Sequence, residues 1–469
     1  MLFRSVIMIT KTSKLKLCSL LALVLLACFG CSKSGGNNPP PVKVTPPPSG
    51  DPAQYGTPYS GVPATKDIVM YEVNIKTFTP ANFQGVEARL DSIKALGVNV
   101  IWLMPTYPIG TDSKSVGSPY CVKDYEGVNS AFGTLDDLRA LVAQAHTLGM
   151  AIILDWEAND TSWDNAWITA NPTWYVQVNG VIQQLSTYTD VAALNFSNQN
   201  MRLALIKAMK YWVLTANVDG YRCDYADGPP TDFWTQALDT LKNITTHKLV
   251  FLAEGTNGSE ISAGFQLGYA FNYYGSIKGV FGGSNASGLF TTNTSELASL
   301  PSPGLKLRYI TNHDDASSDG STIQLYGSKQ GALSAFLITA YMDGVPLIYS
   351  SQEVGYPNKI NFFNNVPVDY TANPDMVAAY KQIIAFRSAH EAIKTGTLTP
   401  YSDPNVVAFE KVSGSDDVLV LANTRNSTET FTVPTALQSP TWANAFAGGT
   451  VTFSTTYTLQ PYQYLVLTK

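Results

Sequence analysis

The sequence is poor in charged residues and in cysteine, and both shortages limit what the protein can be. Asp, Glu, Lys and Arg together make up 14% of the 469 residues, against roughly 25% in an average soluble protein. No cluster of Lys and Arg follows the first 20 residues, so we expect no nucleic-acid partner. Of the five cysteines, only Cys121 and Cys223 lie beyond residue 31, which argues against a disulfide framework.

A long apolar run is also missing, apart from one short segment near the start of the chain. Leu17 to Gly30 is apolar and follows three lysines, but it is shorter than the about 20 residues of a membrane-spanning helix. This pattern is typical of a signal peptide, which we assign to residues 1–31. The stretch LLAC, ending at Cys28, resembles a bacterial lipobox, and Cys31 is a second candidate for lipidation. The alternative is a plain secretory signal without a lipid.

The next segment and the body of the chain differ sharply in composition. Residues 32–63 are rich in Gly, Asn, Pro and Ser and cannot build a core, so we expect an extended linker there. From residue 64 to 391, strand and helix patterns alternate. Apolar, strand-like runs occur at 68–73, 98–104, 151–156, 218–224, 249–254, 267–272, 306–311 and 345–350. Helical spacing of apolar residues occurs between them, for example at 199–215, 231–242, 325–341 and 374–390.

Eight strands that alternate with helices predict an α/β fold, a (β/α)8 TIM barrel. The third strand is followed by an unusually long excursion, at about 157–194. Over residues 392–469 the helical periodicity disappears, and short strands are expected at 406–412, 418–423 and 464–469. This part predicts a C-terminal antiparallel β-sandwich domain.

Three of the predicted barrel strands lead directly to a carboxylate. Asp224 ends the stretch VDGYRCD, Glu254 ends FLAE, and Asp314 ends TNHD. One such acid could simply cap the helix that follows. Because the carboxyl ends of all barrel strands face the active site, three on separate strands are expected to share one pocket. Two carboxyl groups in one pocket can together cleave a glycosidic bond.

The neighbours of these acids suggest different roles for them. Arg222 lies two residues before Asp224, on the same face of the strand, and a cation there favours the ionised form of a nucleophile. A buried Arg–Asp pair that serves stability alone is the alternative. Glu254 follows apolar residues, and burial would raise its pKa, as a general acid requires. His313, beside Asp314, could bind sugar hydroxyls or be purely structural.

Four stretches, in this order, resemble the motifs of glycoside hydrolase family 13, the α-amylase family: ILDWEAND (153–160), VDGYRCD (218–224), FLAEG (251–255) and TNHD (311–314). The resemblance covers about residues 64–469. It implies a barrel with a short B excursion after the third strand and a C-terminal β-domain. It also implies Asp224 as nucleophile, Glu254 as acid/base and Asp314 as transition-state stabiliser.

Further residues match substrate-binding positions of the family. Tyr120 matches the aromatic residue that stacks on the sugar at the cleavage site, and Asp155, Arg222 and His313 match supporting positions. The implied reaction is retaining hydrolysis of α-glucosidic bonds, α-1,4 bonds above all, in starch or malto-oligosaccharides. Such a mechanism predicts a separation of about 5–5.5 Å between the carboxyl groups of Asp224 and Glu254.

The sequence departs from the family pattern beside these acids. The first motif normally ends in Asn-His but here reads Asn159-Asp160. Asp160 could accept a sugar hydroxyl proton, and its charge would favour protonation of Glu254. Asn159 matches a usual calcium ligand, yet Ala193 stands where an Asp is expected, so Ca2+ is possible but lacks part of the oxygen set it needs. The segment after Asp224 also lacks the family's Lys-His pair, which leaves the leaving-group side unassigned.

Two other functions stay open at this point. One is a glucan-binding surface lipoprotein with weak or no catalysis, suggested by Asp160 and Ala193. The other is an α-glucan transglycosylase that uses the same acids. The chain resembles a surface lipoprotein α-amylase of Gram-negative bacteria, which implies lipid anchoring in the outer membrane through Cys28 or Cys31. The sequence predicts no oligomeric state.

Overall fold

The computed structural model describes residues 50–469 of the chain, so the predicted signal peptide and both candidate lipidation sites lie outside it. Pro52–Lys469 form one compact unit. Within the described range, no helix combines the length and the hydrophobicity that crossing a bilayer requires.

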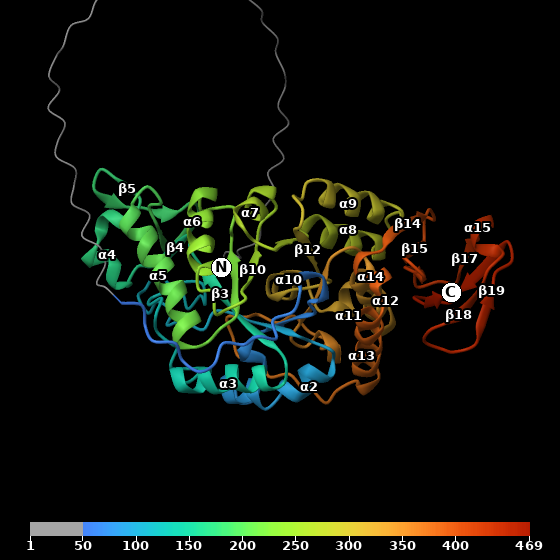
Figure 1. The fold of residues 1–469 in the computed structure, drawn as a ribbon, viewed down its shortest axis with the longest axis horizontal. Coiled ribbons are helices and arrows are strands. Elements are labelled where there is room, and N and C mark those ends of the chain that lie inside the picture. Colours follow the sequence, from blue (N-terminus) through green and yellow to red (C-terminus); the bar gives the residue numbers. More distant parts are fainter. Residues whose placement is uncertain (1–49) are drawn as a thin grey trace, which may run out of the picture. The chain divides into compact units, whose positions relative to one another are not determined.

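Eight parallel strands close into a barrel in the order β1-β13-β12-β11-β10-β9-β3-β2. In each strand, every residue or all but one is buried, as expected for parallel strands that are covered on both faces. Their bounds are β1 Met70–Val73, β2 Val100–Leu103, β3 Ala151–Glu157, β9 Gly220–Asp224, β10 Val250–Ala253, β11 Leu267–Tyr269, β12 Leu305–Arg308 and β13 Val345–Tyr349. The predicted barrel fold is confirmed, and all eight predicted strands overlap these (Figure 1).

Helices surround the barrel (Figure 1). The longer ones are α3 Leu135–Thr147, α5 Gln199–Thr215, α6 Thr231–Lys242, α8 Phe271–Phe281, α9 Gly288–Ala298, α12 Lys329–Tyr341 and α13 Pro374–Ala389. The shorter ones are α1 Phe83–Glu87, α2 Leu90–Ala95, α4 Ala166–Ala170, α7 Gly258–Ala263, α10 His313–Ser318, α11 Thr322–Leu325, α14 Glu391–Thr395 and α15 Thr435–Gln438. Helix α3 starts at a capping box, in which Thr134 and Asp137 bind each other's backbone N–H groups. Such reciprocal caps satisfy amides that a helix start leaves unpaired.

The excursion after β3 forms small sheets of its own. Strands β4 Asp160–Ser162, β8 Tyr188–Ala193 and β7 Gln184–Leu185 make one sheet, and β5 Gln177–Val178 pairs with β6 Val181–Ile182. Because β4 starts three residues after β3 ends, the excursion begins directly at the carboxyl end of the barrel.

The C-terminal part is antiparallel, as predicted. Six strands pair in the order β14-β15-β16-β21-β18-β19, and β17 pairs with β20. Their bounds are β14 Thr397–Tyr401, β15 Val406–Ser413, β16 Asp416–Asn423, β17 Glu429–Thr432, β18 Thr441–Asn444, β19 Thr450–Thr452, β20 Thr456–Leu459 and β21 Tyr464–Thr468. Residues of both sheets, Leu421 and Phe431 among them, share one apolar core. Lys411, fully buried, ties this part to the barrel by binding Asp343 at 2.7 Å.

The predicted linker ends earlier than residue 63. The N–H of Tyr55 donates to the carbonyl of Leu214, 2.7 Å away. The ring of Tyr59 stacks on His146 at 4.4 Å, and Val62 is buried. Residues from Tyr55 onward therefore pack against the outside of the barrel. The contacts of Tyr55 and Tyr59 hold this Pro-containing stretch in place.

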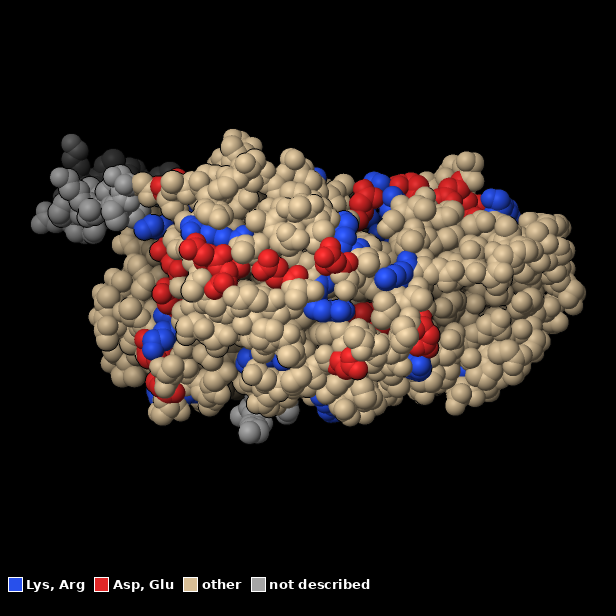
Figure 2. Space-filling view, turned by 90° about the horizontal axis from the view of Figure 1, so that it is seen from below, with Lys and Arg blue, Asp and Glu red and all other residues tan. Residues whose placement is uncertain are grey.

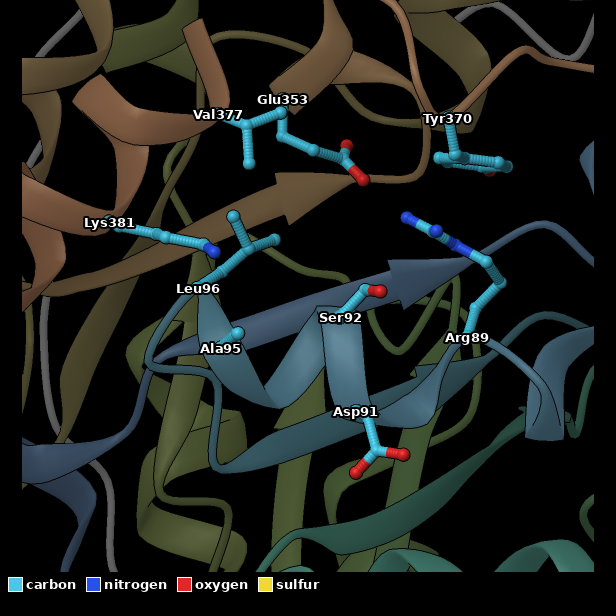
Figure 3. Close-up of a pocket in the computed structure, with 9 residues that line it drawn as sticks. All are labelled: Arg89, Asp91, Ser92, Ala95, Leu96, Glu353, Tyr370, Val377 and Lys381. Carbon is cyan, nitrogen blue, oxygen red and sulfur yellow. The ribbon is translucent and has the colours of Figure 1, made fainter. Parts of the chain in front are cut away.

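Charged residues are sparse on the face shown in Figure 2, where Lys and Arg intersperse with Asp and Glu and uncharged residues cover most of the area. A cavity of about 290 Å³ lies beside α2 and α13. Arg89 and Glu353 point toward one another across it (Figure 3). None of the acids predicted for catalysis lines this cavity.

Candidate active site

The three predicted catalytic acids lie at the carboxyl end of the barrel. Asp224 is the last residue of β9, Glu254 directly follows β10, and Asp314 lies in the first turn of α10, after β12. Their side chains are 11%, 12% and 33% exposed. Asp314 is therefore the acid most open to a bound molecule, and Asp224 and Glu254 lie deeper.

One buried guanidinium joins the acids on the neighbouring strands. Arg222 Nη1 donates to Asp224 Oδ1 and to Asp155 Oδ1, each at 2.7 Å, while Nη2 lies 2.9 Å from Glu254 Oε2. The strand register explains this, because Asp155 on β3 is the direct neighbour of Arg222 on β9. The guanidinium also lies over the ring of Trp102, 4.9 Å from its centre. Arg222 thus fixes three carboxylates relative to one another.

The environment of Glu254 favours its protonated form. Burial raises the pKa of Glu254 to about 8, and the nearby carboxylates Asp224 and Asp314 add to this rise, while Arg222 opposes it. The backbone N–H of Tyr225 donates to Glu254 Oε2 at 2.8 Å. At neutral pH the side chain therefore carries a proton, as was predicted from its apolar strand, while Asp224 accepts a hydrogen bond from Arg222.

His313 lies in a chain of hydrogen bonds that crosses the site. Its Nδ1 lies 2.6 Å from Glu72 Oε1, and its Nε2 lies 2.7 Å from the hydroxyl of Tyr120. Burial lowers the pKa of His313, but the carboxylates of Asp314 and Glu72 outweigh this and raise it to about 9. Both ring nitrogens are then donors. Tyr120 in turn donates to Asp155 Oδ2 at 3.2 Å.

The supporting residues are buried, and this decides what they can touch. Asp155, Arg222 and His313 are each at most 1% exposed, so in this conformation they position other groups. Burial raises the pKa of Asp155 to about 6, against the effect of Arg222. Asp160 is fully buried in β4 and its carbonyl accepts from the hydroxyl of Tyr125. The prediction that Asp160 binds substrate therefore needs correction, because its side chain offers a sugar no surface.

The side-chain amide of Asn159 joins two strand ends. It donates to Glu157 Oε1 at 2.9 Å and to the carbonyl of Asp224 at 3.2 Å, which links β3 to the end of β9. Within residues 50–469, no group of three or more His, Cys, Asp and Glu side chains could hold a metal ion. Calcium also takes amide and backbone carbonyl oxygens, so the metal role of Asn159 stays a prediction.

Sequence reasoning missed Glu72, Trp102 and Tyr225. Glu72 lies in the apolar stretch MYEV of β1, and a single carboxylate in such a strand was the available signal. Trp102 Nε1 donates to Asp155 Oδ2 at 3.1 Å. The backbone contact of Tyr225 with Glu254 leaves no trace in residue type, so no pattern could have shown it.

Several known proteins are similar to this chain in sequence. Residues 72–181 match the family described as alpha amylase, catalytic domain. This stretch, from β1 into the excursion after β3, is similar to an α-amylase catalytic domain. The chain is 25% identical over 415 residues to Alpha-amylase 2 of Dictyoglomus thermophilum, covering 82% of this chain and 70% of that protein. It is also 25% identical over 382 residues to a cyclomaltodextrinase of a Bacillus species, covering 74% of this chain and 66% of that one.

Solved α-amylase structures share the fold as well. The crystal structure of an α-amylase from Lactobacillus plantarum superposes with a TM-score of 0.77 at 25% identity, over 86% of this chain and 99% of that one. The matched range begins at Glu72, so the family match and the hydrogen-bond chain through His313 start at the same residue.

The contact between Glu72 and His313 can be tested by NMR. In a Glu72→Gln variant, the pKa of His313 should fall by about 1–2, because an opposite charge is lost while burial of the ring remains. The chain has four histidines, so their ring signals can be followed in a pH titration of labelled protein. The ring signals of the other three histidines should be the same in the variant and in the unmodified protein at every pH. An unchanged pKa of His313 would show that Glu72 does not control its charge.

Proposed function

We propose that the protein is a retaining glycoside hydrolase that cleaves α-glucosidic bonds, of the α-1,4 type, in starch or malto-oligosaccharides. The observation that carries this proposal is the single guanidinium of Arg222 between Asp224 and Glu254. The guanidinium contacts both carboxyl groups, and Glu254 has a raised pKa. A nucleophile and a general acid on one bond are what the retaining mechanism needs.

The reaction follows from these two groups. The Asp224 carboxylate attacks the anomeric carbon while Glu254 gives its proton to the leaving oxygen, which forms a glucosyl-enzyme ester and releases the first product. Glu254, now ionised, takes a proton from water as the water attacks the same carbon and frees Asp224. Asp314, the most exposed of the three acids, stabilises the positive charge that develops on the sugar.

The relatives support the same chemistry. Their names include α-amylases, a cyclomaltodextrinase and probable oligo-1,6-glucosidases. A maltosyltransferase of Rhodospirillum rubrum is 32% identical over 196 residues, which cover 37% of this chain. Transfer to a sugar in place of water is therefore the second candidate function, and it uses the same acids.

Loss of the nucleophile tests the enzymatic function. In Asp224→Asn, release of reducing ends from starch should fall by a factor on the order of 10⁴, as for catalytic residues that act as a unit. Asp232→Asn is a matched control, since this exposed acid on α6 forms a surface ion pair with Arg202. If the unmodified protein released no more reducing ends than Asp224→Asn, glucan binding without catalysis would be the function. Products longer than the substrate would indicate transfer.

The proton on Glu254 predicts a limit to activity at high pH. The value of kcat/KM on maltotriose should fall above about pH 8, tenfold for each further pH unit, because the pKa of Glu254 is about 8 and the ionised form cannot protonate the leaving oxygen. Rates between pH 5 and 10 give the profile. With α-maltosyl fluoride, whose leaving group needs no proton, this limb should disappear. An equal fall of kcat/KM at high pH with both substrates would show that Glu254 is not the general acid.

We also propose that the protein is anchored to the outer membrane of a Gram-negative bacterium through a lipid on Cys28 or Cys31. The support is the sequence LLAC at 25–28, which lies outside the described residues. A variant with serine at both positions should move from the membrane fraction to the soluble fraction. Cys18→Ser, in the same segment, should stay with the membrane, and membrane association of the double variant would contradict the proposal.

A further inference from the structure

Tyr225, the residue directly after the proposed nucleophile, has an exposed aromatic ring. It is 49% exposed, while its neighbours Asp224 and Ala226 are buried. Within residues 50–469, Tyr55 is the other aromatic residue that is more than a third exposed, and its ring is covered by Arg139, 4.1 Å from the ring centre. Large aromatic side chains are normally buried, so an open ring beside the catalytic acids needs an explanation.

The backbone holds this ring in a fixed place. Tyr225 has a φ of 39°, a left-handed backbone conformation that residues other than glycine rarely adopt. The N–H of Gly228 donates to the carbonyl of Tyr225 at 2.9 Å, which closes a tight turn. A Cβ added to Gly228 would lie 3.0 Å from two carbons of the Tyr225 ring. The ring therefore rests against the glycine, and a larger residue would push it away.

The turn is also fastened to the loop that follows Glu254. Asp227 accepts hydrogen bonds from the side-chain amide of Asn257 at 2.8 Å and from the hydroxyl of Thr256 at 3.2 Å. The N–H of Thr256 donates to the same carboxylate. These bonds join the segment with the nucleophile to the segment with the acid, and Tyr225 lies between the two.

The position relative to Glu254 tells which side of the cleaved bond Tyr225 faces. The N–H of Tyr225 lies 2.8 Å from Glu254 Oε2, and Glu254 protonates the oxygen through which the departing sugar is attached. The main chain of Tyr225 therefore lies beside the group that meets the leaving sugar. Aromatic rings present an apolar face to such a ligand.

We propose that Tyr225 stacks on the glucosyl residue on the leaving-group side of the cleaved bond. This inference rests on the proposed function and assigns a residue to the side for which the sequence offered no match. The same position receives an acceptor sugar in transfer. In that step an acceptor hydroxyl attacks the anomeric carbon, the ester bond to Asp224 breaks, and the hydroxyl proton goes to Glu254. Tyr225 would then favour a sugar over water as the acceptor.

Two substrates separate this role from a structural one. In Tyr225→Ala, kcat/KM on maltotetraose should fall about 10- to 100-fold, a range typical for loss of one apolar contact to a substrate. With α-maltosyl fluoride, which has no sugar on the leaving side, kcat/KM should change less than about twofold. Tyr225→Phe keeps the ring and should match the unmodified protein on both substrates. With the fluoride and added maltose, Tyr225→Ala should also give a smaller share of transfer products.

The outcomes are distinguishable from failure of the proposed function. If the unmodified protein hydrolyses neither maltotetraose nor the fluoride, the proposed function itself is wrong. If it hydrolyses both, and Tyr225→Ala is unaffected on maltotetraose or equally impaired on both substrates, the stacking role is wrong. Equal impairment would mean that the residue only supports the turn that holds Glu254.

Discussion

The contact of Arg222 with three carboxylates is the interaction on which the site depends. A guanidinium that is fully buried is costly to desolvate unless it is paired and hydrogen-bonded. Asp155, Asp224 and Glu254 provide these partners from three neighbouring strands. In return they are held at fixed positions by a rigid planar fork. The closed barrel is what brings the three strand ends to one cation.

The same cation contacts acids in different surroundings. Burial raises the pKa of Glu254 against the opposing effect of Arg222, whereas Asp224 receives a direct hydrogen bond from the guanidinium. Across the site, His313 stays charged because the carboxylates of Asp314 and Glu72 lie beside its ring. The protonation of Glu254 and His313 is therefore set by burial and by neighbouring charges. This is the usual way in which one fold carries both an acid and a base at one pH.

The sequence predicted the barrel well because its strands are short apolar runs, whose repetition is visible without knowledge of contacts. It also located Asp224 and Glu254 at strand ends, while Asp314 lies in the helix that follows its strand. It did not reveal Glu72, because only closure of the barrel places β1 near the start of α10. Helices α8 and α9 were missed as well. They contain Gly, Ser, Thr and Asn, residues of weak helix preference, and their mutual packing overrides that preference. The calcium role of Asn159 and the substrate role of Asp160 were inferred from motif positions. Burial of the Asp160 side chain overturns the second, and the first stays a prediction.

The left-handed backbone at Tyr225 has a consequence for the stability of the fold. A non-glycine residue in this conformation costs on the order of 1 kcal/mol, and glycine would remove that cost. Glycine would also remove the ring. Position 225 is thus a point beside the nucleophile at which the backbone conformation favours glycine, whereas the proposed contact with the sugar requires an aromatic side chain.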